Sequence, residues 1–280
     1  MGKRLLRPLL LMAGMLLGTA MSVQAAPASG FVWADCFSAD AAGSARFYAQ
    51  WLGWSADVPA ADGSIILRRP DGRPVAGIMP RPAGKGSGAQ ALWVGYVGVD
   101  DPAAAASTVV SAGGRQLATP LDLANRGQAS LVQTPDGVPM GLLANASGTG
   151  LAPGSWVWAE YFSADTGRAQ AFFAKALGWN SQPEARTERS DDFLLETGDS
   201  AHAGLAPVPA GRRPAWLGFL AVDKLEPFAD RLQQLGGRVL RAPAPLGQGR
   251  VMVVADPFGA ALALVETAPA PEEDTPGVTK

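Results

Sequence analysis

Nearly the same segment occurs twice in this chain. Residues 33–40 read WADCFSAD and residues 158–165 read WAEYFSAD, an offset of 125 positions. Each copy leads into an aromatic stretch that ends in Leu-Gly-Trp, at 52–54 and again at 177–179. A repeat with this spacing indicates a tandem architecture.

Further pairs keep the register along both copies. Gly77 matches Gly204 (offset 127), Trp93 matches Trp216 (offset 123) and Pro135 matches Pro257 (offset 122). Because the offset drifts by only a few residues, the copies differ by small loop insertions and deletions. Both halves are therefore expected to share one fold.

The N-terminus is typical of a secretory signal. Lys3, Arg4 and Arg7 precede an apolar run from Leu9 to Met21, and small residues around Ala25 suit a signal peptidase. The alternative, a membrane anchor, needs about 20 uninterrupted apolar residues. We predict a signal peptide at 1–25 and a periplasmic or secreted protein.

The amino-acid composition excludes some classes of binding partner. Removal of three leader cations leaves 20 Lys and Arg against 25 Asp and Glu, a net charge of −5, with no basic cluster. Nucleic acid and anionic membranes are therefore not expected partners. The single Cys36 permits no internal disulfide, so packing must stabilise the fold. We expect a monomer with two pseudo-twofold halves.

Strand and helix patterns alternate in a fixed order. Residues 31–37 alternate as a strand, and Asp40 caps a helix that ends at Gly53. Strands follow at 65–68 and 75–79, and then the order restarts with a strand at 92–99. Later elements complete the first half: a helix at 102–112 and strands near 116–118, 129–133 and 139–144.

Each half therefore contains the order βαβββ twice. The predicted divisions are a first domain at 29–146, a second at 154–267, and a disordered tail at 268–280 that lacks apolar periodicity.

Several motifs follow one another in each half: a strand with Asp, a helix with Phe47-Tyr48 or Phe172-Phe173, Leu-Gly-Trp, and later Asp256-Pro257-Phe258-Gly259. In this order, the motifs resemble the vicinal oxygen chelate superfamily, which includes glyoxalase I, bleomycin-resistance proteins and extradiol dioxygenases. The resemblance covers Phe31 to Glu266 and is strongest to tandem glyoxalase-like secreted proteins. It implies an α+β fold of four βαβββ modules in two domains, with a ligand or metal inside each curled sheet.

The metal-ligand positions that this resemblance implies hold no suitable side chain. They align with four positions in each half: Trp33, Gly77, Val94 and Gly141, then Trp158, Gly204, Leu217 and Ala263. Zinc, iron and nickel sites need three or four His, Cys or carboxylate ligands, and this chain has one His. We expect no metal and no other cofactor.

Strand parity nominates binding residues instead. Trp33 and Asp35 share one strand face, and Trp158 and Glu160 repeat the arrangement. A ring beside a carboxylate suits a planar or cationic ligand. Alternatively, the rings fill the space of a lost metal and the acids pair with Arg68, Arg69 or Arg81.

Four other residues are candidates for the cleft or for the core. Trp93 and Trp216 each precede a Gly by two residues and form either a wall of the cleft or filler. His202 precedes Ala203-Gly204 on a strand expected to line the cleft, and is the one side chain that ordinarily titrates near neutral pH. Cys36 is expected to be buried and unreactive.

Two functions of different class follow. The first is a metal-free protein that binds an aromatic or amphipathic small molecule through Trp33, Asp35, Trp93, Trp158, Glu160, His202 and Trp216. The second is a metal-independent isomerase or lyase that acts on a carbonyl compound, with Asp35 or Glu160 as general base. A third possibility is a secreted interaction protein.

Overall fold

The computed structural model describes residues 30–81, 90–118, 120–123, 126–144, 156–184, 191–246 and 249–266. The predicted signal peptide and tail, and the connection between the halves at 145–155, lie outside these residues. Within them, no helix is long and apolar enough to cross a membrane.

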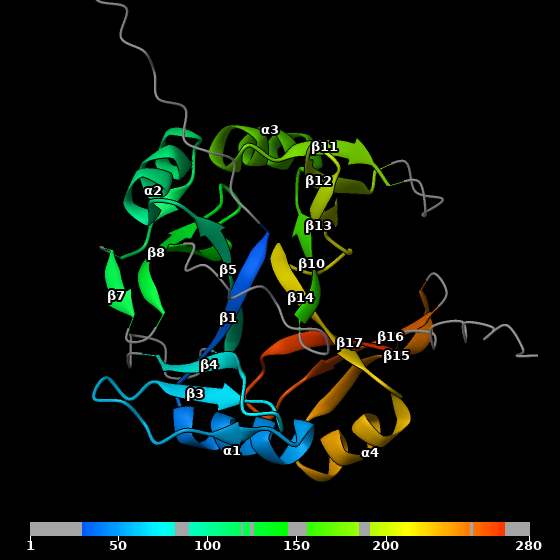
Figure 1. The fold of residues 1–280 in the computed structure, drawn as a ribbon. Coiled ribbons are helices and arrows are strands. Elements are labelled where there is room, and N and C mark those ends of the chain that lie inside the picture. The colour runs from blue at the N-terminus through cyan, green and yellow to red at the C-terminus, as the bar shows by residue number, and fades with distance from the viewer. Residues whose placement is uncertain are drawn as a thin grey trace, which may run out of the picture.

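Two large sheets form the molecule, one from each half of the chain (Figure 1). The first has the strand order β2-β3-β4-β1-β5-β9-β8-β6, with β7 paired to β8. Its strands are β1 Phe31–Ser38, β2 Ser55–Ala56, β3 Ile65–Arg68, β4 Pro74–Pro80, β5 Leu92–Val99, β6 Arg115–Gln116, β7 Leu121–Leu123, β8 Gly127–Gln133 and β9 Pro139–Ala144.

The second sheet repeats this order as β11-β12-β13-β10-β14-β17-β16-β15. Its strands are β10 Trp156–Ser163, β11 Asn180–Pro183, β12 Phe193–Thr197, β13 Ser200–Pro207, β14 Ala215–Val222, β15 Arg238–Leu246, β16 Gly249–Ala255 and β17 Ala261–Glu266. In each sheet the first strand pairs in parallel with the last strand of its own module. It pairs antiparallel with the first strand of the next module. The predicted α+β fold of four βαβββ modules is confirmed.

One helix belongs to each module: α1 Ala41–Leu52, α2 Pro102–Ser111, α3 Thr166–Leu177 and α4 Glu226–Gln234. The carboxylate of Asp40 accepts a hydrogen bond from the Gly43 amide at 2.8 Å, and Asp165 accepts one from the Arg168 amide at 2.9 Å. Gly53 ends α1 with φ +70°, a left-handed conformation that favours glycine. The sequence-based cap predictions are thereby confirmed.

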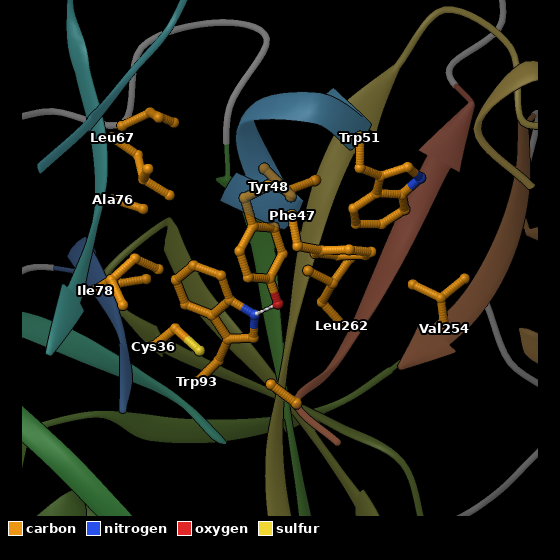
Figure 2. Packing of buried hydrophobic residues seen from close by; sticks show 14 of the residues in the cluster. Cys36, Phe47, Tyr48, Trp51, Leu67, Ala76, Ile78, Trp93, Val254 and Leu262 are labelled. Carbon is orange, nitrogen blue, oxygen red and sulfur yellow. Dashed lines mark hydrogen bonds between the residues drawn. The ribbon is translucent and has the colours of Figure 1, made fainter. Parts of the chain in front are cut away.

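The helices pair between the halves. In Figure 1, α2 and α3 lie together at one end of the molecule, and α1 and α4 lie together at the other. One buried cluster accordingly combines Tyr48, Trp51 and Trp93 with Leu262 and Val254 of the second half (Figure 2). The other joins α2 with α3. Each apolar core is therefore completed by both halves.

Buried hydroxyl groups tie the halves together at two related places. Tyr48 accepts a hydrogen bond from the Trp93 indole at 2.9 Å (Figure 2). Its hydroxyl also donates to the Asp256 carboxylate at 2.8 Å. At the other end, the Tyr161 and Thr134 hydroxyls lie 2.7 Å apart. In the repeat, Cys36 aligns with Tyr161, and Tyr48 aligns with Phe173. Each half thus supplies one tyrosine, from its helix in the first half and from its strand in the second.

Cys36 is completely buried, as predicted, and burial raises the pKa of its thiol well above the usual value. A neutral buried thiol is a poor nucleophile.

Candidate functional site

A small cavity lies between the two sheets, where β1 and β5 meet β10 and β14. Its ten lining residues form five repeat-related pairs: Phe31 with Trp156, Trp33 with Trp158, Ala34 with Ala159, Trp93 with Trp216, and Gly95 with Gly218. The cavity therefore lies on the pseudo-twofold axis. The structure brings four of the predicted binding tryptophans to this one place.

The central cavity is too small for an aromatic ligand. Its volume is about 30 Å³, whereas a cavity that accepts benzene measures about 150 Å³. Gly95 and Gly218 leave no free room either, because a Cβ on Gly95 would lie 2.5 Å from the Phe31 ring and one on Gly218 would lie 2.6 Å from the Trp156 ring. The space beside Trp93 and Trp216 is thus filled by rings.

Trp93 and Trp216 lie on the helix side of their sheets. The Trp93 indole reaches the Tyr48 hydroxyl, but the Trp216 indole nitrogen is buried without a hydrogen-bond partner in the described part of the chain. The reason is that Phe173 replaces Tyr48 in the second half. Neither tryptophan is on the face that carries Asp35 or Glu160.

The inner face of the first sheet is closed by its own side chains. Asp35 is completely buried and accepts two hydrogen bonds from Arg126, at 2.7 and 2.9 Å, and one from the Trp33 indole at 2.7 Å. The Arg126 guanidinium also lies over the Trp33 ring, 5.3 Å from its centre. Burial, together with a hydrogen bond to Asp35, raises the pKa of Tyr96. Asp35 is therefore a paired structural charge.

The second sheet has a corresponding carboxylate, Glu160, but no described residue takes the place of Arg126 beside it. The Trp158 indole donates to Glu160 at 3.2 Å, and no lysine, arginine or histidine among the described residues pairs with Glu160. The pKa of Glu160 is raised to about 7, chiefly by burial, which outweighs the Trp158 hydrogen bond, with smaller contributions from the nearby carboxylates of Asp192 and Glu184. Near neutral pH, Glu160 therefore exists in both protonation states.

Three replacements explain the difference between the faces. By repeat register, Tyr96 corresponds to Phe219 and Met79 to Ala206, so a hydroxyl and a long side chain are lost. Arg126 corresponds to Gln248, a residue outside the described ranges, so the sequence offers no cation at that position. The second face accordingly has fewer groups of its own to satisfy its acid.

Solvent exposure also differs between the inner faces of the two sheets. In the first half Trp33, Asp35 and Val94 are buried, whereas their counterparts Trp158, Glu160 and Leu217 are only partly buried. Val253 and Val265 add partly exposed apolar surface beside Trp158. The inner face of the second sheet is thus a partly exposed apolar surface that carries the Glu160 carboxyl group beside Trp158.

Glycines make room for both acids. Asp35 lies opposite Gly77, and Glu160 lies opposite Gly204, in neighbouring parallel strands. A Cβ at these glycines would lie 2.1 Å from Asp35 Oδ1 and 2.0 Å from Glu160 Oε2. Each carboxyl group therefore occupies the space where a side chain of the adjacent strand would stand.

The described residues do not fit a metal ion. No group of three or more His, Cys, Asp or Glu side chains converges among them. The aligned ligand positions are occupied by apolar residues or by glycines that Asp35, Glu160 and, at Gly141, the Tyr96 ring cover. A site of the superfamily's metal-binding type is thus not formed by this donor set.

His202 does not lie with Glu160. The pairing of β12 with β13 shifts between Leu195 and Glu196, which leaves His202 as an extra residue. This bulge directs its ring to the helix side, where it stacks on Trp179 with ring centres 5.0 Å apart. Burial lowers the pKa of His202. Its strand lines the inner face through Gly204 instead.

Sequence reasoning missed Arg126 and Tyr96. The arginines considered as partners for the acids lie elsewhere: Arg68 pairs with Asp57, and Arg69 pairs with Asp71. Arg81 donates to the Gln90 carbonyl. A comparison of Arg126 with Gln248 in the repeat is the signal that distinguishes the two acids.

Comparisons with known proteins agree with this architecture. A family model described as a glyoxalase-like domain matches residues 158–265. The chain is 32% identical over 255 residues to the anthracycline biosynthesis protein DnrV of Streptomyces peucetius, covering 84% of this chain and 92% of that protein.

Solved structures show the same fold. The Mn(II)-bound glyoxalase of Novosphingobium aromaticivorans matches with a TM-score of 0.62 at 15% identity, covering 86% of this chain and 83% of that one. The 2,3-dioxygenase LapB of Pseudomonas sp. KL28 matches with a TM-score of 0.60 at 15% identity, covering 88% and 96%. The chain belongs to the vicinal oxygen chelate superfamily, in its glyoxalase-like branch.

Proposed function

We propose that this protein binds an aromatic or amphipathic small molecule on the inner face of its second sheet, without a metal ion. The observation that carries the proposal is the contrast between Asp35, which Arg126 neutralises, and Glu160, which is partly exposed beside the Trp158 ring. The Trp158 ring provides a surface on which a planar ligand can stack, and the Glu160 carboxyl group orients that ligand through a hydrogen bond. A relative named for anthracycline biosynthesis is compatible with a small-molecule role.

In this proposal the first sheet supports the second. The Asp35 carboxylate on this face already accepts hydrogen bonds from the Trp33 indole and from Arg126, so it is not available to a ligand. From the predicted signal sequence, we expect the binding activity in the periplasm or outside the cell. The donor set predicts far less than one transition-metal ion per purified chain, which elemental analysis measures.

A second candidate is acid–base chemistry at Glu160. A carboxyl group whose pKa is about 7 is suited to remove a proton from a carbon next to a carbonyl. Such a reaction also needs a donor to stabilise the oxyanion. The Trp158 indole, which could act as such a donor, already donates to the Glu160 carboxylate. Binding therefore ranks ahead of catalysis.

Two probes and isothermal titration calorimetry test the binding proposal. Acetophenone offers a carbonyl acceptor to protonated Glu160, so its affinity should fall as pH rises through about 7. The hydroxyl of 2-naphthol donates to the ionised form, so its affinity should rise over the same interval. Glu160→Gln should remove both pH dependences, and Trp158→Ala should weaken both ligands roughly tenfold.

Two variants serve as controls. Trp33→Ala enlarges the same central cavity but changes the first face, so it should leave both affinities intact. Asp40→Ala removes a helix cap and should lower stability alone. If Trp33→Ala and Trp158→Ala weaken binding equally, the second face is not the site.

The catalytic candidate has its own readout. In D₂O, a general base would exchange the methyl hydrogens of acetophenone, which proton NMR follows, and Glu160→Gln would abolish the exchange while binding persists. Binding without exchange supports the first candidate.

A further inference from the structure

A second, larger pocket lies at the seam between the halves, away from both inner faces. We call it the seam pocket. Leu52 and Trp54, at and just beyond the end of α1, line one side, and Leu220 of β14 and Phe228 of α4 line another. Arg69 and Asp223 are the charged residues of its lining. Its volume of about 230 Å³ exceeds that of a cavity that accepts benzene.

The repeat shows why Trp54 offers an open ring surface whereas its counterpart, among the described residues, does not. Trp179, the counterpart of Trp54, is completely buried because His202 stacks on it and Phe31 meets its edge, with ring centres 6.2 Å apart. Val75 stands at the position that corresponds to His202, so no side-chain ring covers Trp54 in the same way. Trp54 remains partly exposed and stacks with Tyr48, at 6.5 Å between ring centres.

The charges of the lining favour a cation. Arg69 is only slightly exposed, and its guanidinium lies 3.1 Å from Asp71, a carboxylate that Arg73 also contacts at 2.9 Å. Asp223 is exposed and, in the part of the chain that the structure describes, forms no ion pair. An aromatic ring with an acid nearby stabilises an ammonium group through both electrostatic and cation–π attraction.

We propose that the seam pocket binds a small aromatic amine, with its ring between Trp54 and Phe228 and its ammonium group at Asp223. The site is independent of Glu160. The pocket volume suits one ring and a short chain, so phenethylamine is the appropriate probe.

Calorimetry with the full chain tests the proposal. Phenethylamine should bind saturably, and more tightly than the anion 3-phenylpropanoate. Asp223→Asn should weaken the amine by roughly two- to fivefold, as expected for an exposed ion pair. Trp54→Ala should weaken it by roughly tenfold, and Trp54→Phe, which retains a ring, should restore most of the affinity.

Two controls locate the effect. Asp100 is the repeat counterpart of Asp223 and is also exposed, so Asp100→Asn should leave amine binding unchanged. In the Glu160→Gln background, Asp223→Asn and Trp54→Ala should cause the same losses of amine affinity, which separates this site from the inner face. No saturable binding, equal binding of the anion, or equal losses in Asp100→Asn and Asp223→Asn would each overturn the proposal.

Discussion

Arg126 determines which of the two inner acids is available. The ion pair of Arg126 with Asp35 is almost completely inaccessible to solvent and also holds the Trp33 ring. Removing one partner of a buried pair leaves an uncompensated charge, which is far more costly than removing both. The second half has Gln248 at the corresponding position, and among the described residues the hydrogen-bond partner of Glu160 is the Trp158 indole.

Arg126→Met should therefore destabilise the protein by about 3–5 kcal/mol. Asp35→Asn combined with Arg126→Met should recover much of that loss, because no buried charge remains. Urea unfolding followed by circular dichroism measures both. Equal destabilisation by the single and double variants would show that packing of the arginine, and not its charge, is what matters.

Glu160 should make stability depend on pH in the opposite direction from an ordinary ion-paired acid. Its folded-state pKa of about 7 lies above the unfolded value near 4.5, so the folded state binds more protons between these values. The contribution is complete below about pH 4.5 and is lost as pH rises through about 7. Its size is on the order of 1–3 kcal/mol, given partial exposure.

Glu160→Gln should reduce this loss of stability with rising pH. Urea unfolding of the wild type and the variant at pH 5, 6, 7 and 8 gives the difference between their free energies of unfolding. The effects of other groups whose pKa is raised, such as Asp256, cancel in this difference. A difference that does not change with pH would mean that Glu160 titrates normally.

Sequence parity correctly placed Trp33 with Asp35 and Trp158 with Glu160, because a strand fixes alternate side chains on one face. It did not find Arg126, which lies 91 residues from Asp35 in the chain and meets it only after the sheet has curled. No local pattern encodes such a contact. Likewise, the tryptophans were expected in two separate clefts, but the pairing of the halves brings four of them around one central cavity.

At the scale of elements, the repeated caps and Leu-Gly-Trp ends were sufficient to predict α1 and α3. The two-residue strand β2 and the three-residue β7 were not predicted, because so few residues show no alternation. The position of His202 was also beyond prediction. It depends on a bulge set by the pairing of β12 with β13, whereas regular alternation would place it on the same face as Gly204.

Strands β4 and β13 provide a matched pair of substitutions. In Gly77→Ala the new methyl would meet Asp35, which Arg126 and Trp33 hold in place, so the cost should be about 2–3 kcal/mol. In Gly204→Ala it would meet the end of the longer, partly exposed Glu160 side chain, which can rotate away, at a cost below about 1 kcal/mol.

The two substitutions should affect ligand binding in the opposite order from their effects on stability. Gly204→Ala displaces Glu160 and should weaken 2-naphthol binding, whereas Gly77→Ala should not affect it. Thermal unfolding and calorimetry on the two variants supply both measurements. Equal loss of stability would indicate that Glu160 is held as rigidly as Asp35.

At the scale of the molecule, both buried cores are shared between the halves. Trp156 of the second half packs in the cluster around α1 and donates to the Val75 carbonyl at 3.2 Å. Trp51 of the first half donates to the Phe228 carbonyl of α4 at 2.9 Å. Neither sheet covers its helices alone, so separation would expose apolar surface on both.

The halves should therefore fold only together. We expect residues 29–146 and 154–267, produced as separate chains, to bind the dye ANS and to lack a cooperative urea transition. When mixed, they should form a one-to-one complex with near-UV circular dichroism like that of the intact chain. Tyr48→Phe, which removes the 2.8 Å bond to Asp256 across the seam, should weaken this complex. Ser107→Ala, on the exposed side of α2, is the matched control. Cooperative unfolding of either half alone, unchanged by adding the other, would show that the sheets are independent domains.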